Sequence, residues 1–502
     1  MKHQLTIALG LSLSSFWAHA QLNLNGHFYG QDAFRYAQNQ TVFSARSLGV
    51  GGGGSALGGD VSNAFMNPAG LGFYNRNEFT VSPMFVSQET SSSYLGSTTG
   101  QTQTQTRIGQ AALVLSNPGV GTRRKRSSFS IGYNRLIDFG NDFRYQGTND
   151  RSSILDYFAQ KVTEENVAPG VLDSEFDSGR GIAETASAMY YQAYLIDPLN
   201  ENNVYVASEL SVPVRQEGRV RQAGGLGQTT LSYGVNFDDQ LYFGASLGFL
   251  RLNYTNFSNH QETFPNAEVL RGMNFGDDLQ VAGSGVNLTL GVIYKVGKIG
   301  QLGVDVTTPA SMRVRETYLS RVSINPVPGV LETRFNQIET IPSDFDYRLT
   351  TPWRANVGGM VFLPQKLGFV HANIGYVGYQ GLRVQDRSSD SWTNQQNRAI
   401  EDRYSDVLNF QGGAEVRVGL GRLRAGYQYL ANADQVGFSS SQKNLTLGAG
   451  IRVEKFYVDL GAIFGTTRLG YTPYELQNTA DFASVNSERS FQRYLLTFGF
   501  NF

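Results

Sequence analysis

The sequence has no cysteine, and its charges nearly cancel, with 41 Lys and Arg against 42 Asp and Glu in 502 residues. Without cysteine the chain has no disulfide framework and no thiolate for catalysis or metal binding. A near-neutral balance provides no basic surface for the phosphates of DNA or RNA. We therefore expect no nucleic-acid partner.

Histidine is also scarce. Beyond residue 20 the only histidines are His27, His260 and His371, which are far apart in the sequence. The H-E-x-x-H motif of metalloproteases does not occur. The sequence therefore predicts a protein that is not an enzyme and that uses no metal or other cofactor. A serine or aspartate paired with His371 inside a barrel stays open as a minor alternative.

No long hydrophobic run remains once the first 20 residues are set aside. Lys2 precedes an apolar stretch from Leu5 to Trp17, and Ala18-His19-Ala20 fits a cleavage site. We therefore expect residues 1–20 to be a secretory signal peptide that is not part of the fold. No later segment approaches the roughly 20 continuous apolar residues of a transmembrane helix. This pattern excludes a helical membrane protein.

The last ten residues alternate between two faces. One face carries Tyr494, Leu496, Phe498, Phe500 and Phe502, and the other carries Arg493, Thr497, Gly499 and Asn501. Successive side chains of a strand point to opposite faces, so this pattern predicts a strand with one apolar face. An apolar outer face is typical of transmembrane barrel strands. A final phenylalanine matches the way in which bacterial outer-membrane barrels end.

Similar alternation recurs from residue 78 onward. We count fourteen strands, at 78–88, 107–116, 127–140, 217–237, 241–255, 282–296, 299–318, 348–362, 367–382, 406–418, 421–432, 443–453, 456–468 and 489–502. Short joints such as Glu454-Lys455 alternate with long polar segments such as 383–405, as periplasmic turns and extracellular loops do. The sequence therefore predicts an all-β fold, a transmembrane antiparallel β-barrel of about 14 strands formed by residues 78–502.

Residues 150–200 do not fit the barrel wall. They contain helix-like spacing between turn-forming stretches such as Ala168-Pro169-Gly170. The parity of the strands places this insertion outside the cell. It is either a partly helical extracellular cap or a solvated insertion, and both interpretations stay open.

Residues 21–77 also lack alternation, and they are rich in glycine. Gly51–Gly54 allow sharp reversals of the chain because glycine adopts positive φ without steric cost. Gly49 to Gly54 formally match the G-x-G-x-x-G pattern of a phosphate-binding loop. We reject a nucleotide site because no strand precedes the pattern and no Lys-Ser or Lys-Thr follows it.

The motif Asn67-Pro68-Ala69-Gly70-Leu71 follows the glycine-rich stretch. Together they resemble the amino-terminal hatch of the FadL/TodX family of outer-membrane transporters for hydrophobic compounds. The resemblance implies that residues 21–77 form a hatch or plug inside the barrel. It also implies passive uptake of hydrophobic or amphiphilic small molecules, such as long-chain fatty acids or aromatic compounds. The expected location is the outer membrane of a Gram-negative cell, with membrane lipid and a hydrophobic small molecule as partners of a monomer.

A second class of function stays open beside transport. A barrel with a large extracellular insertion could scaffold a surface-protein or secretion complex. An open apolar pocket beneath the loops favours transport, whereas a filled lumen and a large exposed apolar patch on the insertion favour scaffolding.

The candidate site residues form two groups. Phe65, Met66 and Phe73 flank the hatch motif, and we expect them to gate or close the floor of a ligand pocket. The alternation rule also points four arginines into the lumen, namely Arg354, Arg417, Arg424 and Arg452. These arginines either pair with other lumenal charges, such as Arg452 with Asp459, or bind the carboxylate of an amphiphilic substrate.

Deletion of residues 21–77, with the signal peptide kept, should raise the single-channel conductance in planar bilayers. The reason is that we expect a segment with no lipid-compatible face to lie in the lumen and to fill it. A disordered periplasmic tail is the alternative that a glycine-rich segment also permits. The conductance of the purified deletion variant and of the wild type checks this expectation. If conductance and hydrophobic uptake both stay at wild-type values, the segment is no hatch.

Overall fold

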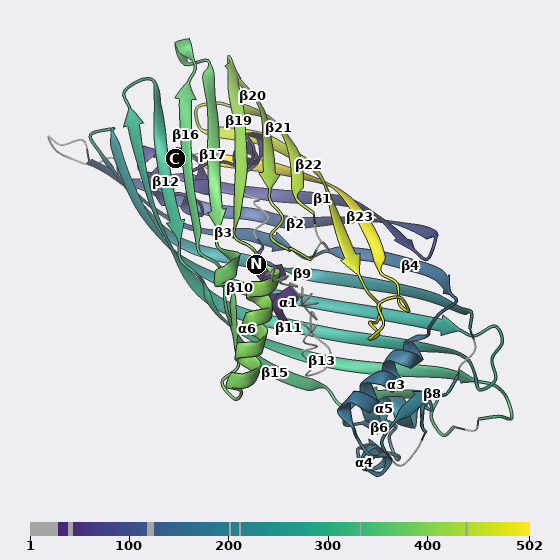
Figure 1. Cartoon of the computed structure of the whole chain (residues 1–502). Coiled ribbons are helices and arrows are strands. Elements are labelled where there is room, and N and C mark those ends of the chain that lie inside the picture. The colour runs from purple at the N-terminus through teal and green to yellow at the C-terminus, as the bar shows by residue number, and fades with distance from the viewer. Residues whose placement is uncertain are drawn as a thin grey trace, which may run out of the picture.

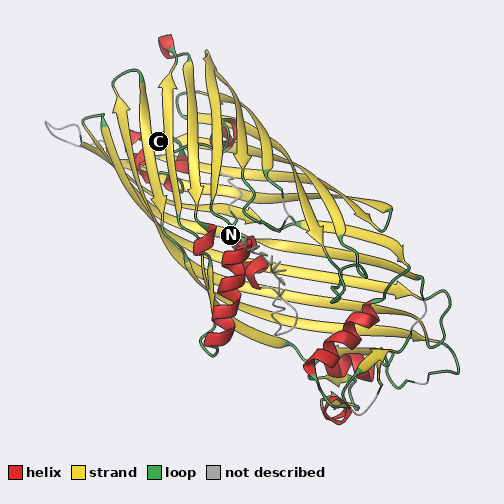
Figure 2. Cartoon of the chain, viewed as in Figure 1, coloured by secondary structure: helices red, strands yellow, loops and turns green. Residues whose placement is uncertain are grey.

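The structure is a computed structural model that describes residues 29–38, 44–117, 125–199, 202–209, 212–331, 333–436 and 440–502 (Figure 1). The expected signal peptide at residues 1–20 lies outside the described residues, and so does the beginning of the expected hatch. Strands form the wall of the molecule, and one group of helices lies at the lower right end of the barrel (Figure 2).

Among the described residues, fourteen antiparallel strands close into a barrel, which confirms the predicted fold. β1 pairs with β2 on one side and with β23 on the other, and this pairing closes the wall. The wall segments are β1 (Glu78–Tyr94), β2 (Ser97–Asn117), β3 (Lys125–Asp138), β4 (Asn141–Asn149), β9 (Val214–Phe237), β10 (Leu241–Thr263), β11 (Leu270–Val296), β12 (Gly300–Thr307), β13 (Ser311–Pro326), β15 (Ser343–Thr350), β16 (Arg354–Phe362), β17 (Gly368–Val377), β18 (Arg383–Gln385), β19 (Val407–Val418), β20 (Gly421–Leu430), β21 (Gln442–Arg452), β22 (Phe456–Tyr471) and β23 (Val485–Asn501).

Four wall strands consist of two segments each. β3 continues as β4, β12 as β13, β15 as β16, and β17 as β18. Pro309 and Pro352 lie in two of these breaks. A proline has no backbone donor for the sheet ladder, so it interrupts pairing. The unbroken strands that the sequence predicts at 299–318 and 348–362 are therefore wrong at these two prolines.

The outer face of the wall is apolar. Outward positions carry exposed hydrophobic side chains on strand after strand, for example Phe243, Leu247, Phe249, Leu288, Leu290, Val292, Phe498 and Phe500. Inward neighbours such as Thr497 are buried, as the alternation in the last ten residues predicts. A continuous apolar surface of this kind suits the hydrocarbon core of a bilayer, not water. No helix among the described residues is long and apolar enough to cross a membrane.

The barrel has a turn end, where short hairpins join the strands, and a loop end. The insertion that follows β4 lies at the loop end (Figure 1). Its described elements are α3 (Ile154–Glu165), α4 (Pro169–Ser174), α5 (Ala186–Gln192) and the short strands β5 (Phe176–Asp177), β6 (Ile182–Ala183), β7 (Ile196–Pro198) and β8 (Tyr205–Ala207). Leu155, Phe158 and Met189 of the helices share one buried apolar cluster with Leu270 and Met273 of β11. The insertion therefore packs against the ends of the wall strands.

A buried carboxylate from the wall also holds the insertion. Glu262 of β10 is fully buried, and it accepts hydrogen bonds from the Ile154 backbone N–H at 2.9 Å and from Gln216 Nε2 at 2.7 Å. The hydroxyl of Ser153, which caps α3, donates to the same carboxylate. The free N–H groups and the dipole at a helix start favour a negative charge. Glu262 thus fixes the start of α3 to the barrel.

Substitution Glu262→Ala should loosen the insertion, because the Ile154 N–H and the Gln216 amide lose their acceptor. Each buried donor left without a partner costs about 1–3 kcal/mol. Limited proteolysis of the folded protein should therefore cut within 150–209 faster than in the wild type. Glu217→Ala is the matched control, since the Glu217 side chain is 43% exposed and pairs with Arg215 at the surface. Equal cleavage rates in the two variants would contradict the role of Glu262.

Candidate functional site

Residues Ser44–Phe73, called the lumenal segment below, are a chain of short helical turns. The turns are α2 (Ala45–Gly49) and two 3-10 helices, η1 (Val61–Ala64) and η2 (Pro68–Phe73). Each begins at a residue whose side chain caps it: Ser44 accepts from Ser47 N, Asp60 from Ser62 N, and Asn67 from Ala69 N. Pro68 then occupies the first helical position, where its missing N–H costs nothing. The Asn-Pro motif is therefore the start of a helical turn.

The lumenal segment contacts the inner face of the wall on several sides. Its hydrogen bonds to wall side chains include those of Ala45 N to Thr497 Oγ1, Gly51 N to Thr446 Oγ1, Ser55 N to Asn373 Oδ1, Ser55 Oγ to Asp305, and of Ser232 and Ser246 to the Ala64 carbonyl oxygen. These partners belong to β23, β21, β17, β12, β9 and β10. The segment therefore spans the lumen near the turn end.

Glycines allow the backbone of the lumenal segment to pack directly against the backbone of the wall. Gly51, Gly52 and Gly53 have φ of 90°, 88° and 86°, which is the region that side chains disfavour. A Cβ on Gly51 would lie 2.5 Å from the carbonyl oxygen of Gly412, and one on Gly413 would lie 2.5 Å from that of Val50. The glycines of the formal G-x-G-x-x-G pattern thus serve close packing against the wall, and no strand-to-helix phosphate loop is present here.

A G-x-S-x-G pattern, which in hydrolases contains a catalytic serine, also has a structural role in this chain. Gly244 to Gly248 formally match G-x-S-x-G, but they lie in the middle of β10 instead of at a strand-to-helix turn. Ser246 is buried, and its hydroxyl donates to the Ala64 carbonyl oxygen at 2.9 Å. Among the described residues, no group of three or more His, Asp or Glu side chains comes together as a metal site.

Buried ion pairs join the lumenal segment to the wall. Arg424 of β20 is fully buried, and it donates through Nε to Glu415 at 2.8 Å and through Nη1 to Asp459 at 2.6 Å. Arg46 of α2 reaches the same Glu415 at 3.3 Å and lies 3.8 Å from Asp60. Burial alone would lower the pKa of Arg46, but the carboxylates of Glu415 and Asp60 raise it above the ordinary value. The guanidinium therefore stays charged.

Asp459 pairs with Arg424 and not with Arg452, so the expected pair of Arg452 and Asp459 is wrong. The two partners lie on β20 and β22, with β21 between them. A Cβ on Gly450 of β21 would lie 1.8 Å from Asp459 Oδ1, so the missing side chain makes room for the pair. Arg452 instead lies over the ring of Tyr457, 4.4 Å from its centroid.

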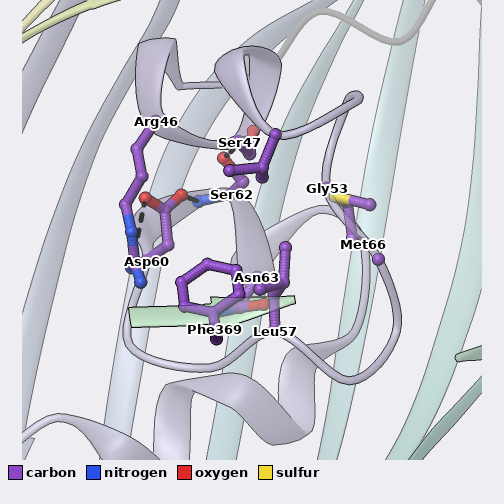
Figure 3. Close-up of a pocket in the computed structure, with 11 residues that line it drawn as sticks. Arg46, Ser47, Gly53, Leu57, Asp60, Ser62, Asn63, Met66 and Phe369 are labelled. Carbon is purple, nitrogen blue, oxygen red and sulfur yellow. Dashed lines mark hydrogen bonds and ion pairs between the residues drawn. The ribbon is translucent and has the colours of Figure 1, made fainter. Parts of the chain in front are cut away.

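A small cavity lies inside the lumenal segment, between α2, η1 and Phe369 (Figure 3). Arg46, Asp60, Asn63 and Met66 line it, and its volume is about 10 Å³. That is room for about one water molecule. It is too small to hold an organic ligand.

A larger cavity of about 190 Å³ lies between the lumenal segment and the helix α1 (Tyr29–Ala37). Phe65 and Met66 of the lumenal segment line it, together with Phe34 of α1. Polar groups of the wall, including Asn356, Asn373, Asn409, Gln411, Arg354 and Arg489, line the rest. An apolar cavity of about 150 Å³ can hold a molecule the size of benzene, so this cavity has room for a small amphiphile.

Between the cavity and the loop end, aromatic and aliphatic side chains occupy the lumen. α1 packs there with α6 (Asp390–Arg403): Tyr29 contacts Trp392, and Phe34 stacks on Tyr404 at 4.4 Å between ring centroids. The inner wall joins this cluster through Leu252, Tyr254, Met312, Val314 and Leu349. Packed apolar side chains thus fill much of the loop half of the lumen, whereas hydrogen-bonding groups predominate in the turn half.

The structure brings together only some of the residues that the sequence singles out. Phe65, Met66 and Arg354 line the larger cavity, and Arg354 donates to the Ala37 carbonyl oxygen. Phe73 does not line it, because its ring stacks on Tyr242 with 4.0 Å between centroids. Arg424 belongs to the ion-pair network, and Arg417 is 41% exposed and lies 3.4 Å from Glu415.

Sequence reasoning missed most of the cavity lining, including Arg489 and Phe34. Arg489 shares the inward face of β23 with Arg493 and Thr497. The alternation of the last ten residues, continued from Arg493 by four residues towards the amino terminus, therefore places Arg489 in the lumen. Phe34 belongs to α1, where Tyr29, Ala33, Tyr36 and Ala37 are buried. Their spacing of three and four residues is the helical signal that could have located α1.

No protein-family model matches this chain, and neither does any curated protein. Among solved structures, it is similar to a FadL homologue of Pseudomonas aeruginosa, with 12% identity, a TM-score of 0.52, and coverage of 93% of this chain and 100% of that one. It is also similar to the Pseudomonas putida toluene transporter TodX, with 13% identity, a TM-score of 0.54, and coverage of 92% and 99%. At these identities the likeness shows a shared fold.

Substitution Arg46→Gln should loosen the lumenal segment while the wall stays folded. Breaking a buried ion pair costs about 3–5 kcal/mol, and Arg46 is slightly exposed, so we expect a value near the lower limit. Hydrogen exchange of the amides in 44–73 should be faster than in the wild type. Arg417→Gln is the matched control, because Arg417 contacts the same carboxylate from an exposed position, where pairs contribute about 0–1 kcal/mol. Equal exchange in the two variants would refute the anchoring role.

Proposed function

We propose that this barrel lies in the outer membrane and takes up hydrophobic or amphiphilic small molecules passively. The observation that carries the proposal is the cavity of about 190 Å³ inside a closed barrel with an apolar outer face. The similar structures support it, since one is a toluene transporter and another a FadL homologue. In this proposal the lumenal segment is the hatch that blocks the lumen on the periplasmic side.

The change of lining along the lumen supports a route for such ligands. A hydrophobic molecule entering at the loop end meets the apolar cluster around α1 and α6 first, where burial of its surface is favourable by about 25 cal/mol per Å². The cavity below adds polar groups that can orient a head group. Phe65 and Met66 bound the cavity on the hatch side, so a displacement of the hatch opens the way towards the periplasm.

Two arginines are suited to the polar end of an amphiphile. Arg354 and Arg489 both line the cavity. Arg489 Nε has no hydrogen-bond partner among the described residues, and a buried donor of this kind favours a ligand that supplies an acceptor. A carboxylate bound at either guanidinium group would accept charge-assisted hydrogen bonds. We therefore propose long-chain fatty acids among the substrates, beside neutral aromatic compounds.

The remaining partners follow from the same arrangement. Outer-membrane lipid covers the apolar outer face, and a monomer suffices because the cavity lies inside one barrel. A scaffold for a surface-protein or secretion complex needs no such cavity, so the cavity inside the barrel supports transport over this alternative. A transporter also agrees with the similar structure of TodX, which is a toluene transporter.

Substitution Arg354→Leu should lower the uptake of a labelled long-chain fatty acid by about tenfold, since a hydrogen bond to a charged group contributes about 1.5 kcal/mol. Uptake of toluene should stay at the wild-type level because toluene has no carboxylate. Cells that express each variant are compared with cells that lack the protein.

Arg468→Leu is the control for this experiment, since it removes a positive charge at an exposed pair with Glu488. The neighbours Thr467 and Leu469 line the cavity, and the Arg468 side chain lies on the opposite face of β22. If Arg354→Leu lowers the uptake of both compounds equally, Arg354 acts through the fold and not on the carboxylate. If cells with and without the protein take up both compounds at the same rate, the proposed function is wrong.

A further inference from the structure

The lumenal segment is attached unevenly to the wall. On the side of β12, β17, β19, β20 and β21 it makes direct hydrogen bonds and the ion pair of Arg46 with Glu415. On the side of β2 and β3 its contacts are apolar, with Val61, Ala64, Phe65 and Leu71 against Ala112 and Val114 of β2. Among the described residues, no hydrogen bond joins the lumenal segment itself to β2 or β3, and the nearest one is that from Ser116 of β2 to the Tyr74 carbonyl oxygen, directly after the segment.

That apolar contact lies over a column of polar side chains. Gln110 of β2 and Asn134, Ser130 and Ser128 of β3 all face the lumen and are 0–1% exposed. Gln110 and Asn134 are opposite each other in the ladder, yet the side-chain oxygen and nitrogen of both residues have no partner among the described residues. The hydroxyls of Ser128 and Ser130 have none either.

The neighbouring strands show that this column is unusual. Ser130, Ser232 and Ser246 lie at one height on β3, β9 and β10, each opposite the next. Ser232 and Ser246 both donate to the Ala64 carbonyl oxygen, at 2.7 and 2.9 Å. Only the serine on β3 is left without an acceptor. A dry column would cost about 1–3 kcal/mol for each unpaired group, and native proteins satisfy such groups with ordered water.

One side chain divides the column in two. Gly132 lies between Asn134 and Ser130 on the inward face of β3, and a Cβ there would lie 2.8 Å from Phe65 Cζ. The ring of Phe65 thus rests on Gly132, with the two amides towards the loop end and the two serines towards the turn end. Phe65 also lines the larger cavity. Displacement of this one ring would connect the two halves of the column.

We propose that water fills the seam between the lumenal segment and strands β2 and β3, and that Phe65 is the valve of a polar passage along it. When the ring leaves Gly132, water and small hydrated cations pass from the cavity to the turn end. The lumenal segment stays attached to the opposite wall through Arg46 and Glu415. This conduction needs no hydrophobic ligand, so it is an activity separate from the proposed uptake.

Planar-bilayer recording of Phe65→Ala tests the valve. The single-channel conductance for potassium should rise severalfold over the wild type. Leu48→Ala is the matched control, because it also removes a large buried side chain from the lumenal segment. Leu48 packs against Met84, Ile463 and Leu495 on another side of the wall. Equal conductance in the two variants would overturn the assignment of Phe65.

The native chain has no cysteine, so single cysteines report on the seam even if Phe65→Ala does not fold. Ag⁺, a small hydrated cation, should react with Ser130→Cys in the folded barrel and should react at least tenfold more slowly with Ser246→Cys. The two positions share height, residue type and burial, and differ in the bond to Ala64. Equal protection of both cysteines shows a dry seam and overturns the proposal. The uptake assays are independent of this result.

Discussion

The need to pair buried charge organises the interior of this barrel. Glu415 sits on an inner wall that water reaches poorly, and an isolated carboxylate there would be costly. Arg424 and Arg46 neutralise it from two directions, one from the wall and one from α2. The position of α2 sets where the chain reverses at Gly51–Gly53. The position of the reversal in turn sets where Phe65 and Met66 meet the cavity.

The lumen is therefore divided by chemistry as well as by geometry. Towards the loop end, α1 and α6 are embedded among aromatic and aliphatic side chains, which exclude water and accept apolar molecules. Towards the turn end, hydrogen bonds and ion pairs hold a segment that lacks any long regular element. The cavity lies at the boundary of these regions. A molecule with an apolar body and a polar end can satisfy both sides at once.

The wall of the barrel could be predicted from the sequence because a strand with one face towards lipid carries apolar side chains at every second position. Phe498 and Phe500 must face hydrocarbon, and Thr497 must not. The same rule could not place the strand breaks, since alternation continues across Pro309 while the ladder does not. It also underestimated β1, which extends to Tyr94, because outward side chains beyond the lipid no longer have to be apolar.

The candidate site was less predictable, for a related reason. Alternation tells which face a side chain occupies but not which neighbour it meets. Arg424 reaches Asp459 across an intervening strand, and only the glycine at position 450 permits that contact. Phe65 and Phe73 look equivalent in sequence on either side of the Asn67 motif. They diverge because one ring rests on Gly132 of β3 and the other on Tyr242 of β10.

The glycines at the contact between the lumenal segment and the wall also constrain the order of assembly. Gly51 and Gly413 bring two backbones so close that neither surface can slide past the other with side chains in between. The segment also precedes β1 directly, and β1 closes the cylinder by pairing with β23. Entry into a finished cylinder would require the segment to move along the inner wall, and the close backbone contacts oppose this movement. The geometry therefore favours an order in which the segment is in position before β1 and β23 pair.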